Sequence, residues 1–317
     1  MKLEDIGFYT LSDDRAKSIN GTSPMCRCEL LVTSACNFRC PYCRGVKGLK
    51  GHLPLDSALE ILNLWINDGL QNVRFSGGEP TLYPHLKRLV ALCKVRGVKR
   101  IAISSNGSAD RQVYEELLAA GANDFSISLD ACCASFANKM AGLEDCHFDK
   151  VAGNIRFLSE RCYTTVGVVL TEDNIAEITK IVSFADSLGV HDIRVIPAAQ
   201  FGKALPPEIL RGMGKHRILN YRINNMKSGQ SVRGLTERDS DRCHLVMDDS
   251  AVVGDSHYPC IIYLREGGKP IGKVGPDMRA ERVNWAKNHN CFSDPICRGN
   301  CLDVCRDFNN KVGERSD

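Results

Sequence analysis

The eight residues from Cys36 to Cys43, which read CNFRCPYC, constrain this chain more than any other segment. They bring three thiols together with the spacing C-x3-C-x2-C, directly after an apolar run from Leu30 to Val32. An iron–sulfur cube has four irons, and ferredoxin-type patterns supply one thiolate to each. This loop offers three thiolates, so its spacing predicts a cluster in which one iron is left open to a small molecule.

The cysteines of the chain fall into two groups. The 317 residues include 16 cysteines: ten from Cys26 to Cys162, none from 163 to 242, and six from Cys243 to Cys305. The opening residues MKLED carry acids where a signal peptide needs apolar residues, and no apolar run is long enough to cross a membrane. We therefore expect a cytoplasmic protein whose thiols bind metal rather than form disulfides, with two separate metal sites.

Strands and helices are predicted to alternate along the first two thirds of the chain. Apolar patterns predict strands at 29–33, 72–75, 100–104, 124–129, 165–170 and 192–196, and helices at 56–68, 84–96, 110–120, 150–161 and 174–188. Alternation of this kind predicts an α/β fold with a parallel sheet and helices outside. Such folds carry their chemistry at the C-terminal ends of the strands.

A second motif follows the second predicted strand. Here the sequence is Gly77-Gly78-Glu79-Pro80. Paired glycines permit close approach of the backbone, and a fixed carboxylate can receive a cation such as an amino group. The position of the motif, at the end of a strand and one helix after the thiol loop, makes it stronger evidence for a binding site.

Together, the thiol loop with its aromatic Tyr42 and the Gly-Gly-Glu-Pro motif resemble the radical S-adenosylmethionine (radical SAM) superfamily. The resemblance implies a partial (β/α)6 barrel over residues 29–200. It also implies that Cys36, Cys40 and Cys43 hold three irons of a 4Fe-4S cluster, whose fourth iron is chelated by S-adenosylmethionine (SAM). Reduction of SAM, by a partner such as flavodoxin or ferredoxin, would then give a 5′-deoxyadenosyl radical that abstracts hydrogen from a substrate. A zinc knuckle is the alternative for the thiols, although it leaves Gly-Gly-Glu unexplained.

The resemblance also implies residues that bind SAM. Gly77, Gly78 and Glu79 would take its methionine amino group. Ser104 and Ser128 lie in stretches similar to cofactor-contacting segments of the molybdenum-cofactor cyclase branch and its relatives. The adenine is expected on apolar backbone near residues 168–170 and 196.

The six C-terminal cysteines resemble the auxiliary-cluster extension called SPASM, or its shortened form, twitch. The spacing Cys291-x5-Cys297-x3-Cys301 matches, but Asn288 stands where a further cysteine would open the run. The resemblance therefore implies one auxiliary iron–sulfur cluster, of the 4Fe-4S type, held in a small irregular domain. Its expected ligands are Cys243, Cys260, Cys297 and Cys301, with Cys291 and Cys305 as further candidates. A structural zinc site is the alternative, because sulfur ligation alone does not select the metal.

We expect four parts in the chain: an N-terminal extension at 1–28, the barrel at 29–200, a basic helical connector at 201–239 and the auxiliary-cluster domain at 240–317. The segment 211–233 holds six Lys or Arg and no acid. It is read either as a solvated helix face or as a clamp for a phosphate-bearing substrate.

The resemblance implies an enzyme, and peptide modification is the larger class in this branch: crosslinking, epimerisation or oxidation of a ribosomally made peptide (a RiPP-type maturase). The basic segment points instead to a nucleotide, nucleobase or nucleic acid as substrate. The short segment before residue 29 points the same way, because many peptide-modifying relatives use an extra N-terminal domain there to grip a leader sequence. A third hypothesis, of another class, is a non-catalytic iron–sulfur module that senses redox state.

Overall fold

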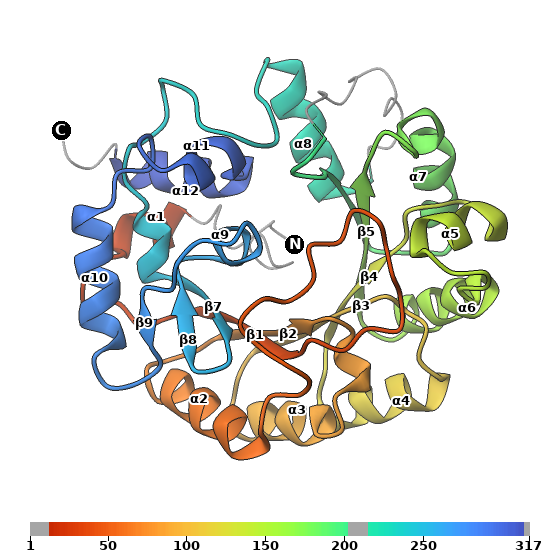
Figure 1. Ribbon diagram of the computed structural model, residues 1–317, viewed down its shortest axis with the longest axis horizontal. Coiled ribbons are helices and arrows are strands. Elements are labelled where there is room, and N and C mark those ends of the chain that lie inside the picture. The colour runs from red at the N-terminus through yellow and green to blue at the C-terminus, as the bar shows by residue number, and fades with distance from the viewer. Residues whose placement is uncertain (1–12, 202–214, 314–317) are drawn as a thin grey trace.

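A single sheet of nine strands organises the structure, a computed structural model that describes residues 13–201 and 215–313 (Figure 1). Its order is β6-β5-β4-β3-β2-β1-β7-β8-β9. The strands are β1 (Arg27–Thr33), β2 (Asn72–Gly77), β3 (Arg100–Ser105), β4 (Asp124–Ser128), β5 (Tyr163–Leu170), β6 (Asp192–Pro197), β7 (Asp249–Val253), β8 (Ser256–Tyr258) and β9 (Gly272–Lys273). The first six pair in parallel, in chain order, as the sequence predicts.

Helices cover the outer face of this sheet (Figure 1). They are α2 (Leu55–Asn67), α3 (Leu86–Val95), α4 (Arg111–Ala120), α5 (Ala134–Ala141), α6 (Phe148–Ser159), α7 (Ile178–Ser187) and α8 (Arg217–Lys227), with short 3-10 turns η3 (Pro80–Leu82) and η4 (Ile175–Glu177). In α2 the buried side chains are Ala58, Ile61, Leu62 and Trp65, a helical spacing that places one apolar stripe on the sheet. The architecture is therefore α/β with a partial barrel.

The last third of the chain adds to the same sheet. Strand β7 pairs in parallel with β1, and Arg27 Nη1 lies 2.7 Å from Asp249 Oδ2 across this junction. The remaining elements of this region are η6 (His244–Met247), α9 (Ile261–Arg265), α10 (Met278–Asn288), α11 (Pro295–Asn300) and α12 (Asp303–Gly313). Helix α1 (Asp13–Ser18), from the other end of the chain, packs against α12.

Three features differ from the sequence predictions. Helix α5 was not predicted, and neither were α10 to α12. Buried apolar residues are few in α5 (Met140 and Ala141) and in α10 (Met278 and Ala286). Of the basic helical connector predicted at 201–239, residues 217–227 form α8 and 202–214 lie outside the described residues.

The described residues include no helix that is both long and apolar enough to span a membrane.

Candidate active site and C-terminal thiol site

The thiol loop follows β1 and lies over a cavity of about 280 Å³ at the C-terminal ends of the first four strands. This cavity gathers all eight residues that the sequence analysis assigned to the cluster and to SAM: Cys36, Cys40, Cys43, Gly77, Gly78, Glu79, Ser104 and Ser128. The side chains of Val168 and Leu170, expected near the adenine, are buried in the apolar core, while the Val169 amide donates to Asp130 in the cavity wall. The two motifs thus form one site.

The two glycines permit direct contact between the motifs. A Cβ atom at Gly77 would lie 2.2 Å from the carbonyl oxygen of Thr33, and one at Gly78 would lie 2.2 Å from that of Ala35. In addition, the Gly78 and Glu79 amides donate to these two carbonyls at 2.7 and 2.8 Å. The glycines therefore hold the start of the thiol loop against the end of β2.

Glu79 is 1% exposed and binds the loop after β3. Its Oε1 accepts hydrogen bonds from the Thr81 amide (3.0 Å), the Thr81 hydroxyl (2.6 Å) and the Ser105 hydroxyl (2.9 Å), while Oε2 accepts from the Asn106 amide at 2.7 Å. Burial raises the pKa of this carboxyl, and the hydrogen bonds oppose the shift. The carboxylate thus anchors two loops as well as lining the cavity.

The cavity offers soft donors in a setting that suits thiolates. The Phe38 amide lies 3.4 Å from Cys36 Sγ, and the Gly45 amide lies 3.3 Å from Cys43 Sγ. Burial raises the pKa of Cys36, and that of Cys40 to about 11. N–H donors at sulfur are suited to an iron–sulfur cluster. The donor set fits the cluster.

Sequence reasoning missed two polar groups of the cavity. Asp130, at the end of β4, accepts hydrogen bonds from the Tyr42 hydroxyl and from the Val169 amide, and burial raises its pKa to about 6. Arg265 of α9 donates to the carbonyl of Gly77 at 2.9 Å and to that of Gly45. Asp130 stood within a stretch singled out by its resemblance, whereas Arg265 carries no motif.

The two predicted serines differ in setting. Ser104 accepts a hydrogen bond at 2.9 Å from Arg74, a buried side chain on β2, whereas Ser128 is exposed at the end of β4. Both face the cavity. Ser128 therefore keeps its hydroxyl available to a ligand, and Ser104 is already engaged.

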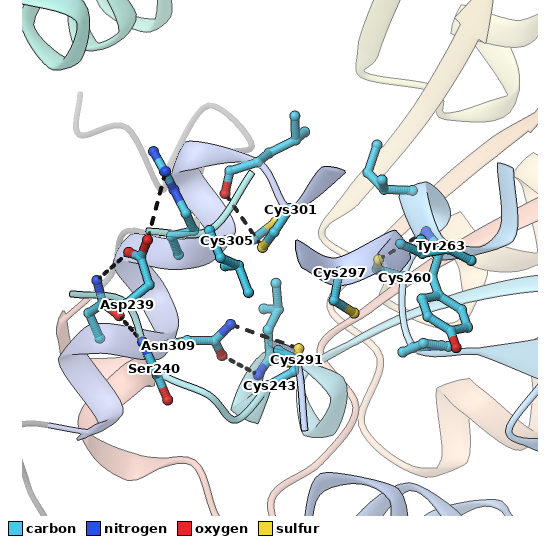
Figure 2. Close-up of a pocket in the computed structure, with 18 of the residues that line it drawn as sticks. Asp239, Ser240, Cys243, Cys260, Tyr263, Cys291, Cys297, Cys301, Cys305 and Asn309 are labelled. Carbon is cyan, nitrogen blue, oxygen red and sulfur yellow. Dashed lines mark hydrogen bonds and ion pairs between the residues drawn. The ribbon is translucent and has the colours of Figure 1, made fainter. Parts of the chain in front are cut away.

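All six C-terminal cysteines line a second, smaller cavity of about 40 Å³ (Figure 2). Cys243 and Cys260 directly precede η6 and α9, Cys291 lies between α10 and α11, Cys297 lies in α11, Cys301 directly follows it and Cys305 lies in α12. The Tyr263 amide donates to Cys260 Sγ at 3.4 Å, and Asn309 Nδ2 lies 3.8 Å from Cys243 Sγ. The four expected ligands are thus brought together, and so are Cys291 and Cys305.

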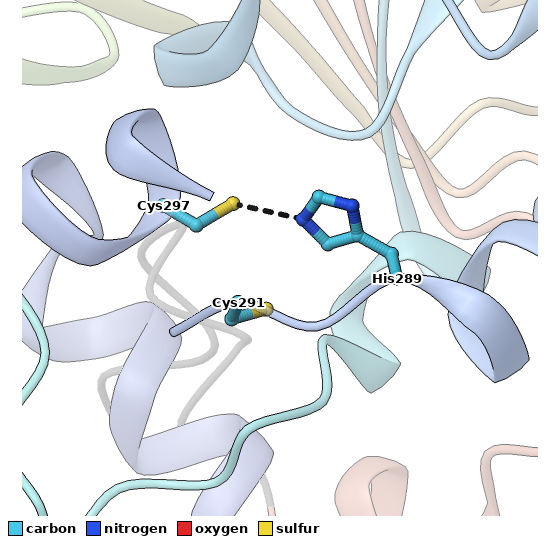
Figure 3. Close-up of side chains that lie close together, drawn as sticks. All are labelled: His289, Cys291 and Cys297. Carbon is cyan, nitrogen blue, oxygen red and sulfur yellow. Dashed lines mark hydrogen bonds between the residues drawn. The ribbon is translucent and has the colours of Figure 1, made fainter. Parts of the chain in front are cut away.

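Some of these thiols influence one another. Interaction with Cys297 lowers the pKa of Cys291 to about 6, and interaction with Cys305, followed by burial, raises the pKa of Cys301. His289 lies beside Cys297, with its Nε2 3.5 Å from Cys297 Sγ (Figure 3). Sequence reasoning did not single out this histidine.

Two of the six basic residues of segment 211–233 are engaged in internal contacts. Arg222 is buried and donates to the Val195 carbonyl and to Asp303, and Arg233 donates to the Pro197 carbonyl at 2.8 Å. Lys215 is exposed and pairs with Asp186. Arg217 and Lys227 are also exposed, and Arg211 lies outside the described residues. Arg222 and Arg233 therefore stabilise the fold, whereas the other three described basic residues lie on the surface.

Comparison with known proteins gives a family and several relatives. Residues 30–185 match the family model of the Radical SAM superfamily. A probable GTP 3′,8-cyclase of Saccharolobus islandicus (strain M.14.25 / Kamchatka #1) is 27% identical over 172 residues, which are 53% of this chain and 55% of that protein. The GTP 3′,8-cyclase of Synechococcus sp. (strain CC9902) is 35% identical over 123 residues, 37% of this chain and 35% of that protein. The chain thus spans about half the length, or less, of these relatives.

Solved structures resemble a larger part of the chain. Native anSMEcpe with bound AdoMet is 17% identical, with a TM-score of 0.61, and the match covers 92% of this chain and 95% of that one. Streptococcus suis SuiB bound to the precursor peptide SuiA is 13% identical, also with a TM-score of 0.61, covering 92% and 78%. At such identity these matches show the fold alone.

Proposed function

Because this chain belongs to the radical SAM superfamily, we propose that it cleaves S-adenosylmethionine reductively and uses the 5′-deoxyadenosyl radical to take a hydrogen atom from a substrate. The observation that carries the proposal is the single cavity lined by all three loop thiols and by Gly77, Gly78 and Glu79. A cluster at the thiols would supply the electron for this cleavage.

The chain's own residues would prepare this site. Cys36, Cys40 and Cys43 would bind three irons and leave the fourth for SAM. Gly77 and Gly78 fix the loop against β2, and the Glu79 carboxylate lies at the cavity wall, where an ammonium group of SAM could meet it. Phe38, Met140 and Phe148 line the same cavity, and apolar walls of this kind exclude water from a reactive radical.

For the substrate we propose a peptide, which the radical would crosslink, epimerise or oxidise. The internal engagement of Arg222 and Arg233 supports this choice, because it removes two of the six basic side chains that argued for a phosphate-bearing substrate. The overall fold is also that of SuiB, whose structure contains a precursor peptide.

A nucleotide is the second candidate substrate. The sequence relatives named GTP 3′,8-cyclase favour it, although they match only the first half of the chain. A flavodoxin or ferredoxin would be the electron donor for either substrate.

Incubation of the reconstituted protein with SAM and dithionite tests the radical chemistry. We expect 5′-deoxyadenosine, none above background with Cys36→Ala, and wild-type amounts with Cys133→Ala, an exposed thiol outside the cavity. Absence of 5′-deoxyadenosine from the iron-loaded wild-type protein would favour a redox-sensing module instead.

The substrate class is tested by the same assay with candidate substrates added. Peptides encoded beside the gene should accelerate formation of 5′-deoxyadenosine. The mass of these peptides should also change during the reaction. Acceleration by GTP, with a nucleotide product, would instead establish the second candidate.

A further inference from the structure

We propose that His289, Cys291 and Cys297 form a mononuclear zinc site, separate from the auxiliary iron–sulfur cluster. Their nitrogen and sulfur ligand atoms all lie within 4.8 Å of one another, the one such group found among the described residues. Figure 3 shows the His289 ring and the Cys297 thiol directed toward each other, with Cys291 beside them. Imidazole and thiolate are the ligands that zinc binds most often in proteins.

The distances match tetrahedral geometry. Ligands bound to zinc at about 2.0 Å (nitrogen) and 2.3 Å (sulfur) lie about 3.5 Å apart in a tetrahedron. His289 Nε2 lies 3.5 Å from Cys297 Sγ. The carboxylate Oδ2 of Asp294 lies 3.6 Å from the same nitrogen, so this carboxylate or a water molecule would take the fourth position.

The ring of His289 is held in place by its neighbours. Trp285 stacks on it with ring centroids 3.9 Å apart and an angle of 15° between the planes, and Tyr263 meets it edge-on at 6.1 Å. The Tyr263 hydroxyl donates to Asp294 at 2.8 Å, and Asp294 in turn accepts from the Cys297 amide at 3.1 Å. Such an outer shell fixes the orientation of metal ligands before the metal binds.

His289 also gives the site a route to solvent. Besides facing the thiols it lines an open surface hollow together with Trp285 and Asn288. Cys291, by contrast, is only 5% exposed. A metal ion can therefore enter from the surface and reach a largely buried position.

A cluster would use these two thiols less well. The ligand atoms of Cys291, Cys297 and His289 lie within 4.8 Å of one another, as the ligands of one ion do, whereas thiolates on different irons of a cube lie farther apart than two ligands of one ion. Assigning these two thiols to zinc leaves Cys243, Cys260, Cys301 and Cys305 for the cluster, with Cys305 in place of the Cys297 expected from sequence.

Metal analysis of the anaerobically purified full chain tests whether these thiols are divided between a zinc site and an iron–sulfur cluster. We expect about one zinc per chain besides iron. Cys291→Ser and His289→Gln should each lower zinc at least ten-fold and leave iron unchanged. The matched control Cys305→Ser should lower iron and leave zinc unchanged. Loss of iron with zinc unchanged in Cys291→Ser, or a wild-type protein without zinc, would overturn the proposal.

X-ray absorption at the zinc edge needs no variant and reports the neighbours of zinc alone, even when iron is present. Two sulfur and two nitrogen or oxygen neighbours would support the site, whereas four sulfurs, or none, would reject it. Both readouts are independent of SAM cleavage, so a failure here is distinguishable from a failure of the proposed radical chemistry.

Discussion

At the scale of single residues, Gly78 shows how a motif can act through what it lacks. Its backbone is not in the left-handed region, so only the contact with the Ala35 carbonyl forbids a side chain. We expect Gly78→Ala to displace the thiol loop and to destabilise the protein by about 3 kcal/mol, since a backbone contact cannot yield as a flexible side chain does. Iron content and the midpoint of denaturant unfolding measure both effects.

Gly275→Ala is the matched control for this change. A Cβ atom there has open space around it, and its φ is also outside the left-handed region. It should leave iron content and stability within about 0.5 kcal/mol of wild type. If Gly78→Ala behaved in the same way, the close approach of the two motifs would not matter for the site.

His257, on β8, makes stability depend on pH. It is fully buried, with Nδ1 3.1 Å from Arg282 Nη1 and Nε2 2.8 Å from Glu281 Oε2. Burial, followed by the charge of Arg282, lowers its pKa from 6.5 to about 4. Between these two pH values the unfolded chain therefore binds more protons than the folded protein. The stability that neutral His257 contributes is complete above pH 6.5 and is lost as pH falls toward 4.

Replacement of His257 measures how much of the pH dependence of stability comes from this histidine. Between pH 7 and pH 5 wild type should lose about 2 kcal/mol more stability than His257→Gln, even though the variant is less stable overall. Denaturant unfolding at the two pH values measures this difference. Equal losses in the two proteins would show that other groups carry the pH dependence.

Prediction from sequence succeeded for residues in a spaced motif and failed for residues brought in from afar. The thiol loop and Gly77 to Glu79 can be recognised by their spacing and by their position after strands. Arg265 reaches the same cavity from about 190 positions further along, through the pairing of β7 with β1. His289 is different, because it stands only two residues before Cys291 and eight before Cys297, so its closeness in sequence to these thiols was visible but was not used.

At the scale of elements, α8 shows that the basic segment has both buried and exposed cations. The side chain of Arg222 is 2% exposed and that of Asp303 on α12 is 0% exposed. Arg222→Ala would leave Asp303 buried without its cation and should cost about 3–5 kcal/mol of stability. Lys227→Ala, on the exposed face of the same helix, should cost less than about 0.5 kcal/mol. Thermal unfolding of the two variants compares them.

The same helix gives a test of nucleic-acid binding. If α8 is structural, an oligonucleotide should bind weakly and Lys227→Ala should not change the salt dependence of its affinity. A clear drop in the salt slope for this variant would restore the clamp interpretation.

Elements were predictable where their own pattern specifies them. The six barrel strands have apolar, β-branched runs that lie between helices, and their observed limits differ from the predicted ones by a few residues at most. Helices α5 and α10 lack a wide apolar stripe; α10, for example, buries Met278, Arg282 and Ala286. Their stability comes from tertiary contacts, which a local pattern does not contain.

At the scale of the whole molecule, the C-terminal region and the barrel share one sheet. Strand β1 lies between β2 and β7, and Arg27 forms ion pairs with Glu29 on its own strand and with Asp249 on β7. Arg265 adds hydrogen bonds to Gly77 and Gly45. We therefore propose that residues 240–317, although a distinct segment by sequence, complete the barrel rather than fold alone.

The two tryptophans of the chain provide the test. Trp65 lies in α2 of the barrel, and Trp285 lies in α10 of the C-terminal region. Single-tryptophan variants, Trp285→Phe and Trp65→Phe, report each half by fluorescence. Because the shared sheet couples the halves, we expect denaturant midpoints that coincide between fluorescence and circular dichroism within each variant. An earlier transition of Trp285, with the barrel signal unchanged, would show instead that the C-terminal region opens independently and that its own metal sites, not β1, hold it together.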